Sequence, residues 1–553
     1  MALPHTVTQF RPRLLDHLPH YSRQNLAADL SAGITVGFVA LPLAMTFAIA
    51  SGLPPQAGLF TAIIAGFLIS ALGGSSVQIG GPAGAFIVVV YAIVERYGIP
   101  NLLIATACAG VLMILMGFLR MGELVRRIPI SIVIGFTSGI AVLIGLAQVK
   151  EFLGLAGPPL PAEFFSKMKA LFVALPSFDA LTFGLGLGCL AVIVFWPKSY
   201  NVQPGLFGRL VSRLPGSLIA IVGSTVLVAV SGLPVETIGS RFGEIPRGFP
   251  SFALPDFDWG TIQFLFAPIL TIALLGAVES LLCARVADSL TKTRHDPNQE
   301  LMAQGIANIA SPLFGGFCAT GTVARTVTNI RSGATSPISG MVHALALLAI
   351  VLGAAPLAED IPLVALSATA LVVAYNMGEW RIFRQLRQYS LGYRITLLST
   401  FVLTIVVDIT VAVEVGIGLA CIFFIWRMSQ LTKLEVISEE ERNARGIAAP
   451  DIQVQRITGV LFFGAVSCLE PLLDPKLALP KTLVLDCSTL LAIDSTGVDA
   501  LQSADAFLAA RGVTLHLASI RPEPLATMTR LGLIDALGSH RVFPTLKGAI
   551  GLD

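Results

Sequence analysis

Charged side chains are scarce in this chain of 553 residues, because Asp, Glu, Lys and Arg together make up only 13% of it. A soluble protein of this size would carry nearly twice that fraction. Hydrophobic residues make up 54%, and the mean hydropathy is +0.80. This balance predicts a polytopic membrane protein, and the net charge of +2 gives no reason to expect a nucleic-acid partner.

Cysteine and histidine are also few, with seven of each, and both are dispersed along the chain. No Cys-x-x-Cys spacing occurs, so the sequence predicts neither a disulfide framework nor a zinc site. His343 lies in an apolar run and is expected to be a packed helix residue and not a metal ligand. The nucleotide-binding pattern GxxxxGK[ST] is missing too, which argues against transport driven by ATP. We expect no metal, no cofactor and no enzymatic activity.

The composition of the first residues predicts no cleavable signal peptide. Residues 1–32 are polar, and the first long apolar run begins only near Gly33. We therefore expect this segment to remain in the cytoplasm as an amphipathic lead-in.

Apolar runs follow one another through the first 430 residues, and a span needs about 20 such residues. Basic residues gather in the connections near 120–127, 198–213, 292–294 and 381–394, whereas the long connection 232–258 is more acidic. The positive-inside rule then favours an even number of spans with both termini in the cytoplasm. The predicted spans are 33–50, 57–72, 77–95, 101–119, 129–149, 180–196, 215–231, 262–287, 299–314, 317–331, 334–353, 362–375, 393–409 and 411–428.

Two of these segments are too rich in glycine and polar residues to be ordinary spans: 77–86 and 315–331. Irregular backbone at membrane depth is tolerated only where protein buries it or where it lines a cavity. Each segment is third in its set of seven, and an odd repeat makes the two sets enter the membrane from opposite sides. This layout is typical of inverted repeats whose broken helices meet at a substrate site. The alternative is that the glycines only permit close packing of helices.

The composition changes after residue 430. Residues 432–446 are strongly charged and Pro450 closes what reads as a linker. From residue 452 short apolar runs alternate with helical patterns, which predicts a soluble α/β domain of about 100 residues. The expected strands are 454–463, 483–486 and 514–519, and the expected helices lie near 496–511 and 524–533.

Several motifs in a fixed order resemble the SulP family of anion transporters along essentially the whole chain. In the membrane part they are residues 29–35, Leu41-Pro42, 298–301 and 319–340. The C-terminal part is similar to a STAS domain at 485–488 and 494–497. The resemblance implies fourteen segments in two inverted repeats of seven, which form a core domain and a gate domain and are usually dimeric. Residues 324–339 look most like the bacterial dicarboxylate-transporting branch.

The resemblance and the residues together divide the chain into four parts. Residues 1–32 form a cytosolic N-terminal segment and 33–430 the transmembrane transport domain. Residues 431–450 form a linker and 451–553 the STAS domain.

Arg325 is the leading candidate for binding the anion. A cation inside the membrane is costly and usually functional, and Arg325 matches the basic residue that the family places at the start of its tenth helix. Alternatively it forms a salt bridge to a neighbouring helix. Backbone N–H groups at two helix starts would bind substrate oxygens. The predicted donors are Gly321, Thr322, Val323 and Ala324 on one side, and Ala83 and Gly84, extending to Ala85, on the other.

Glu279 is the clearest carboxylate in the middle of an apolar run, where burial disfavours its charged form and suits it to carry a proton. The family has an acidic residue here. Sodium-coupled relatives place a threonine one turn later, where this chain has Cys283, a poor ligand for a hard cation. We therefore expect coupling to protons and not to sodium. Alternatively Glu279 neutralises Arg325.

The resemblance also places Leu43 and Phe47 in the wall of the site, where some animal relatives carry glutamine and phenylalanine. Ala83 stands where those relatives have a phenylalanine. This predicts a roomier and less polar pocket, which suits an extended organic anion.

The STAS-like loop 494–497 is similar to one that is phosphorylated in soluble anti-sigma-factor antagonists. Thr496 would be the acceptor, with Ser495 beside it. The alternative is that Ser495 or Asp494 only caps the following helix.

The function expected from the sequence is secondary active anion transport across a bacterial inner membrane, specifically proton-coupled uptake of dicarboxylates such as succinate or fumarate. Transport of sulfate or bicarbonate with protons or sodium remains open, as do a passive anion channel and a membrane sensor that signals through its STAS domain. The expected partners are the anion, the proton, membrane lipid, a second copy of the chain and a cytosolic protein bound by the STAS domain.

Overall fold

The computed structural model describes residues 10–125, 129–196, 216–243, 248, 251–254, 259–407, 409–438, 440–441, 451–473 and 480–551. Parts of the predicted connections at 126–128, 197–215, 244–247 and 255–258, and residues 442–450 of the predicted linker, lie outside these ranges. The chain divides into two compact units, residues 1–417 and 418–553.

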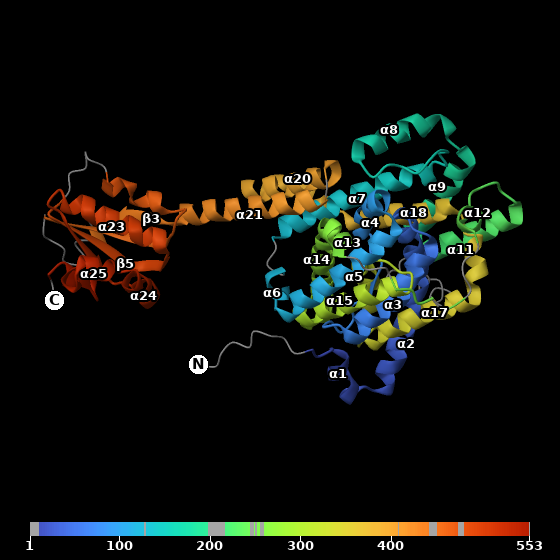
Figure 1. The fold of residues 1–553 in the computed structure, drawn as a ribbon, viewed down its shortest axis with the longest axis horizontal. Coiled ribbons are helices and arrows are strands. Elements are labelled where there is room, and N and C mark those ends of the chain that lie inside the picture. The colour runs from blue at the N-terminus through green and yellow to red at the C-terminus, as the bar shows by residue number, and fades with distance from the viewer. Residues whose placement is uncertain are drawn as a thin grey trace. The chain divides into compact units, whose positions relative to one another are not determined.

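The first unit is helical (Figure 1), and its helices, of which the last, α21, continues past residue 417 into the second unit, fall into two sets. The first set is α2 (Arg23–Ala50), α3 (Pro55–Leu72), α4 (Phe86–Tyr97), α5 (Ile99–Phe118), α7 (Ile130–Phe152), α9 (Ala180–Phe195) and α11 (Gly216–Ser231). The second set is α14 (Phe266–Thr291), α15 (Pro297–Leu313), α16 (Val323–Arg331), α17 (Ile338–Glu359), α18 (Leu363–Met377), α20 (Leu391–Val406) and α21 (Ile409–Leu431). Each predicted span therefore corresponds to one of these segments.

Shorter helices connect the two sets or cover their ends. They are α1 (Leu14–His17), α6 (Gly122–Val125), α8 (Phe164–Ala174), α12 (Ile238–Phe242), α13 (Trp259–Phe264) and α19 (Trp380–Arg384). By length and composition, six of the described helices could each cross a membrane: α2, α3, α5, α7, α14 and α21. The pair that ends in α9 is bent by 113° and could provide a seventh.

The first helix begins ten residues earlier than the sequence predicted. α2 starts at Arg23 because the Ser22 hydroxyl caps it by accepting a hydrogen bond from the Asn25 N–H at 3.2 Å. Its Asp29 is fully buried and accepts from the backbone N–H of Thr335 at 2.6 Å and of Ser336 at 3.2 Å. Residues 23–32 thus belong to the first helix and not to a separate polar segment.

The helices of the first unit pack as a core group and a gate group. In the core group, α15 packs against α5 and α3, and α17 packs against α2 and α3. α5 and α15 cross where Gly110 meets the Gly305 carbonyl, so that a Cβ on Gly110 would lie only 2.6 Å from that oxygen. In the gate group, α7 packs against α18 and α20, and α9 packs against α18 and α11.

Two short strands lie at the centre of the core group. β1 (Gly80–Gly81) pairs antiparallel with β2 (Thr320–Gly321), with Gly80 opposite Gly321 and Gly81 opposite Thr320. α4 follows β1 and α16 follows β2, and both helices are short because an extended strand occupies the first part of each segment. The two broken segments predicted from the sequence therefore meet through their strands.

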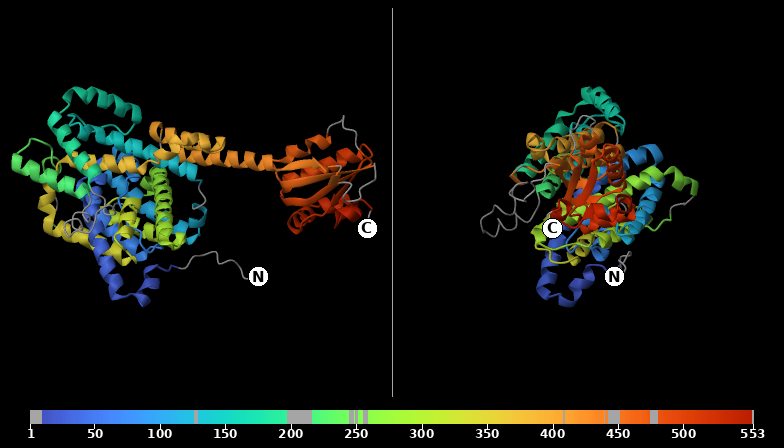
Figure 2. Two further views of the ribbon diagram at one scale, coloured as in Figure 1. Left: turned by 180° about the vertical axis from the view of Figure 1, so that it is seen from behind. Right: turned by 90° about the vertical axis from the view of Figure 1, so that its left-hand side faces the viewer.

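The second unit contains a five-stranded sheet in the order β3-β4-β5-β6-β7 (Figure 2). β4 (Ile452–Leu461), β5 (Thr482–Ile493), β6 (Thr514–Ala518) and β7 (Val542–Phe543) are parallel. The helices of this unit include α23 (Ser495–Ala509), α24 (Pro522–Arg530), α25 (Leu533–Leu537) and α26 (Leu546–Ala549). Its core includes buried leucines from β5, β6 and α23, together with residues of β4, α24 and α25.

Part of the predicted linker is a strand. β3 (Lys433–Val436) pairs antiparallel with β4, and Glu441 forms an ion pair with Arg456 at 2.6 Å. Charged residues suit this position because an edge strand exposes one side to solvent and charges there prevent pairing with another chain. The sequence showed the charges but not the partner strand.

Candidate functional site

The start of α16 presents backbone N–H groups that have no acceptor in the described part of the chain. Thr322 precedes the helix, but its hydroxyl donates to the Ile79 carbonyl at 2.9 Å and does not cap the helix. The Thr322 N–H donates to the same carbonyl at 2.8 Å, and Gly321 is paired with Gly80. The available donors are therefore the N–H groups of Val323, Ala324 and Arg325, one to two residues later than the sequence predicted.

The start of α4 also presents backbone N–H groups without an acceptor. The N–H of Phe86 donates to the Ala83 carbonyl and the N–H of Ile87 to the Gly84 carbonyl. The N–H groups of Ala83, Gly84 and Ala85 have no backbone acceptor among the described residues, and no side chain caps the helix. Two helix N-termini, each with a positive partial charge, thus start from one small sheet.

Arg325 is 1% exposed and lies behind these N-termini. Its Nη2 donates to the Pro82 carbonyl, and its Nη1 is buried without a hydrogen-bond partner in the described ranges. Gly81 has a φ of +145° and lies against the guanidinium, so that a Cβ on Gly81 would be 2.7 Å from Nη1. The guanidinium thus joins the two halves and adds a full positive charge to the two helix starts.

The wall opposite α4 comes from α2 and the gate group. A Cβ on Gly84 would lie 3.4 Å from Ile144 of α7, 3.6 Å from Met377 of α18 and 3.8 Å from Phe47 of α2. Leu43, Phe47 and Ala83 are buried, whereas Val323 is 39% exposed. The predicted wall residues therefore gather with Gly84 in one apolar cluster between the core and gate groups.

Glu279 lies on α14 and is 7% exposed, and its Oε1 has no hydrogen-bond partner among the described residues. No ion pair joins Glu279 to Arg325 within the described ranges, so the structure does not show the neutralising pair considered above. The residues one turn before and after it contact the second half-helix. The Gly276 carbonyl accepts from Thr320 Oγ1 at 3.0 Å, and Cys283 Sγ lies 3.2 Å from Thr326 Oγ1. Positions 276, 279 and 283 share one helix face, which faces β2 and α16.

Glu300 holds the backbone that leads into β1, and sequence reasoning missed this role. It is fully buried and accepts from the N–H groups of Gly74 at 2.9 Å and Ser75 at 3.2 Å. It also accepts from Gln304 at 3.0 Å and Ser280 at 3.3 Å. The available signal was a row of polar residues on α15, inside what otherwise read as a span.

Two asparagines fix the strands from the other side. Asn308 exchanges two hydrogen bonds with the backbone of Ala319, at 2.8 and 2.9 Å. Asn329 donates to the Val77 carbonyl at 2.9 Å. Since these groups are buried, losing a partner would leave polar atoms unsatisfied, which costs about 1–3 kcal/mol each.

The loop before α23 in the second unit is capped by Asp494. Its Oδ1 accepts from the Gly497 N–H at 2.8 Å and its Oδ2 from the Phe463 N–H at 3.1 Å. Ser495 and Thr496 are exposed and take no part in the cap. His343 is a buried residue of α17, and within the described ranges no group of His, Cys, Asp or Glu side chains could hold a metal ion.

A polytopic helical fold with two opposed half-helix starts and a buried arginine defines a membrane anion transporter. The chain belongs to the sulfate permease family, because residues 26–400 match the model described as "Sulfate permease family". Residues 447–549 match the STAS domain. It is therefore a multi-pass transport protein of the SulP type with a C-terminal STAS domain, and not an enzyme.

Relatives and solved structures agree with this assignment. The putative sulfate transporter YvdB of Bacillus subtilis is 39% identical over 535 residues, which cover 95% of this chain and 97% of the relative. The bicarbonate transporter BicA of Picosynechococcus sp. is 33% identical and covers 76% of this chain and 74% of the relative. The solved transmembrane domain of a cyanobacterial BicA is 32% identical, with a TM-score of 0.63 over 71% of this chain and 98% of that one. Murine Slc26a9, at 18% identity and a TM-score of 0.84 over 97% and 93% of the two chains, shares the fold.

The dicarboxylate branch suggested by residues 324–339 is not supported by these relatives, whose names indicate sulfate and bicarbonate. The physical reason is that the matching stretch forms α16 and the start of α17. This stretch contributes only one of the two helix starts, and the side chains next to Gly84 come from α2, α7 and α18.

Proposed function

We propose that this chain is a proton-coupled secondary active transporter of a small oxyanion, in the first place sulfate. The observation that carries the proposal is the pair of uncapped half-helix starts with the buried Arg325 behind them. The names of the relatives support sulfate or bicarbonate as the anion.

The charge of the site suits a compact dianion. Each helix N-terminus is equivalent to roughly half a positive charge, and Arg325 adds one more. Together they provide about two positive charges, close to one another and beside a cluster of buried apolar side chains. Sulfate has two negative charges and oxygens pointing in every direction, so it can accept from both donor sets at once. Bicarbonate has one negative charge and would leave about one of the two positive charges of the site without a counter-charge.

A dicarboxylate remains the second candidate because of the small side chain of Ala83 and the apolar wall at Leu43. These leave room for a carbon chain beside the donors. However, the two carboxylates of succinate lie at opposite ends of the molecule, so only one of them could meet the convergent donors.

Protons are the coupling ion that the residues around Glu279 favour. A buried carboxylate without a partner is costly in its charged form, whereas sodium prefers several oxygen ligands. At the position one turn after Glu279, Cys283 offers sulfur, and the nearby Thr326 hydroxyl already accepts from the Ile79 N–H at 2.9 Å.

We infer from the basic connections that both termini lie in the cytoplasm. The Bacillus subtilis relative supports the cytoplasmic membrane of a bacterium as the location. We expect a homodimer, and we expect the STAS domain to regulate transport by binding a cytosolic protein. The exposed hydroxyls of Ser495 and Thr496 are candidate phosphorylation sites, because Asp494 supplies the helix cap without them.

Counterflow in proteoliposomes tests the proposed substrate. Vesicles loaded with unlabelled sulfate should accumulate labelled sulfate, and sulfate should compete better than bicarbonate or succinate. If the vesicles exchanged succinate but not sulfate, the substrate would be a dicarboxylate and not sulfate. A conductance without exchange would indicate a channel. If the protein showed neither exchange nor conductance, the sensor would be the remaining function.

Gly81→Ala is expected to reduce sulfate counterflow by at least about tenfold while the protein stays folded. The new Cβ would push the Arg325 guanidinium away from the Pro82 carbonyl, and a displacement that loses one charge-assisted hydrogen bond costs about 1.5–3 kcal/mol. The positive φ adds strain for alanine. Gly145→Ala is the matched control, because a Cβ there meets nothing within 4 Å. Equal transport by both variants would contradict the position assigned to Arg325.

A further inference from the structure

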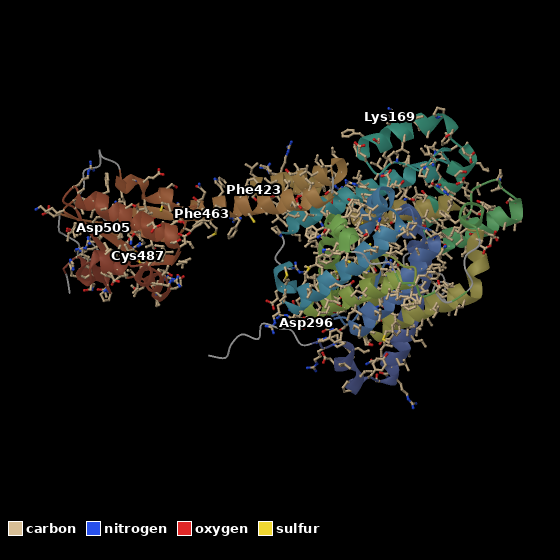
Figure 3. The ribbon with its side chains drawn as sticks, viewed as in Figure 1. Lys169, Asp296, Phe423, Phe463, Cys487 and Asp505 are labelled. Carbon is tan, nitrogen blue, oxygen red and sulfur yellow. The ribbon has the colours of Figure 1, made fainter. Side chains whose placement is uncertain are left out.

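A cavity lined by arginines lies away from the half-helix starts. It has a volume of about 420 Å³ and is lined mainly by polar side chains. Asp296, labelled in Figure 3, is one of its lining residues and lies at the edge of the helical unit. The cavity shares no lining residue with the transport site.

Three arginines from separate parts of the chain converge on this cavity. Arg13 comes from the segment before α1, Arg120 from the turn after α5 and Arg294 from the connection between α14 and α15. Basic residues are common in cytoplasmic connections, but that rule does not require them to line one cavity. Guanidinium groups repel one another, so their convergence is favoured by nearby negative charge.

The carboxylates of the cavity only partly balance these charges. Asp296 caps α15 and uses its Oδ1 to accept from the N–H groups of Asn298 at 2.9 Å and Gln299 at 3.1 Å. Glu123 is the other carboxylate in the lining. Arg13 Nη1 lies 3.1 Å from Asp16 Oδ2, whereas Arg294 is exposed and takes part in no ion pair within the described ranges.

A buried histidine adds a polar group without a partner. The His295 side chain is 0% exposed, and its Nδ1 lies 2.7 Å from Asp288 Oδ2. Its Nε2 has no hydrogen-bond partner among the described residues. Buried polar atoms of this kind are uncommon and call for a ligand, a water or a function.

The backbone around the cavity is strained at two places. Arg120 has a φ of +60° and Lys292 a φ of +58°, and Ser519 is the other described non-glycine residue with a positive φ. Arg120 follows the end of α5, where its N–H bonds to the Gly117 carbonyl at 3.1 Å and glycine is the usual residue. This conformation is uncommon for residues other than glycine.

We propose that this cavity binds a phosphate group, supplied either by a soluble cytosolic phosphate or by the headgroup of an anionic phospholipid. The planar guanidinium offers paired donors that match phosphate oxygens. The volume lies in the range of small-molecule sites, about 300–1,000 Å³. The arginine-rich connections that supply the donors are the ones assigned to the cytoplasmic side.

The cavity is connected to the backbone that leads into β1. The Arg13 N–H donates to the Gly73 carbonyl at 2.9 Å, and the Asp296 N–H donates to the Gly74 carbonyl at 3.1 Å. Glu300, one turn after Asp296, accepts from Gly74 and Ser75. A bound phosphate would hold the N-terminal segment and the start of α15 against this backbone, and so stabilise the core group.

Binding of inorganic phosphate to the purified full-length chain tests the soluble source. Wild type should bind it, and Arg13→Gln and Arg294→Gln should each weaken binding by at least about tenfold, the loss of one charge-assisted hydrogen bond. Lys292→Asn is the control, because it removes the same charge from the same connection outside the cavity, and asparagine tolerates a positive φ. Arg325→Ala should bind phosphate as wild type does, since the transport site is separate.

Lipid retention by the protein in nanodiscs tests whether the phosphate group comes from a phospholipid headgroup. If free phosphate does not bind, wild type should retain phosphatidylglycerol over phosphatidylcholine, as measured by native mass spectrometry. Arg13→Gln and Arg294→Gln should lose that preference and Lys292→Asn should keep it. The proposal is overturned if neither ligand binds, if Lys292→Asn weakens binding as much as the cavity variants, or if only Arg325→Ala abolishes it.

Discussion

Replacing Arg325 by alanine is expected to reduce sulfate counterflow by roughly ten- to a hundredfold and to leave the protein folded. The buried guanidinium supplies the only full positive charge that the described structure places behind the two helix starts. A hydrogen bond to a charged group contributes about 1.5–3 kcal/mol, and every 1.4 kcal/mol is a factor of ten in affinity. Nη1 has no hydrogen-bond partner among the described residues, so its burial without a partner costs free energy of folding. The alanine variant removes this cost, and we therefore expect it to fold.

Arg331→Ala is the matched control for this experiment. Arg331 ends the same helix but is exposed, so its loss should change transport little. Arg325→Lys should recover part of the activity, since it restores the charge without the paired donors. Wild-type affinity for sulfate in Arg325→Ala would remove Arg325 from the site.

The second large effect is expected for Glu279→Gln, which should abolish pH-driven accumulation and keep counterflow. An ionised Glu279 would compete with the anion for the positive field of α16, so the anion should bind best when Glu279 is protonated. Linkage then requires the proton to bind more tightly when the anion is bound. In wild type, a lower outside pH should therefore accelerate uptake, and a pH gradient should drive accumulation.

Glutamine mimics the protonated side chain but cannot release a proton. The variant should bind and exchange sulfate at every pH and should gain nothing from an imposed gradient. Glu414→Gln is the control, because Glu414 is an exposed carboxylate of α21. Both activities should be measured in the same vesicles, and undiminished pH-driven accumulation by Glu279→Gln would exclude it as the proton carrier.

The arrangement of the membrane segments could be predicted because it depends on patterns within single stretches. The apolar runs gave each span, and the glycines of 77–86 and 315–331 interrupted the third span of each half. The same holds for β4, β5, β6 and α23 of the STAS domain, where short apolar runs and Asp494 mark the elements, whereas β3 and β7 were not predicted. Such local patterns can be recognised without knowing which distant residues the segment contacts.

The features that the sequence did not predict depend on residues far apart in the chain. Thr322 loses its role as a donor because it bonds to Ile79, 243 positions earlier. Glu300 bonds to Gly74, 226 positions away, and α2 extends to Arg23 partly because Asp29 finds partners beyond residue 330. The dicarboxylate prediction rested on residues 324–339 and on the apolar wall at Leu43 and Ala83, whereas the names of the relatives indicate sulfate and bicarbonate.

A structure of the full-length chain with bound selenate tests the central claim most directly, because selenium can be located by its anomalous scattering. The account predicts a selenium peak between the starts of α4 and α16, with selenate oxygens accepting from the N–H groups of Ala83–Ala85 and Val323–Arg325. A peak found only elsewhere, for example in the cavity of Arg13 and Arg294, would contradict the account.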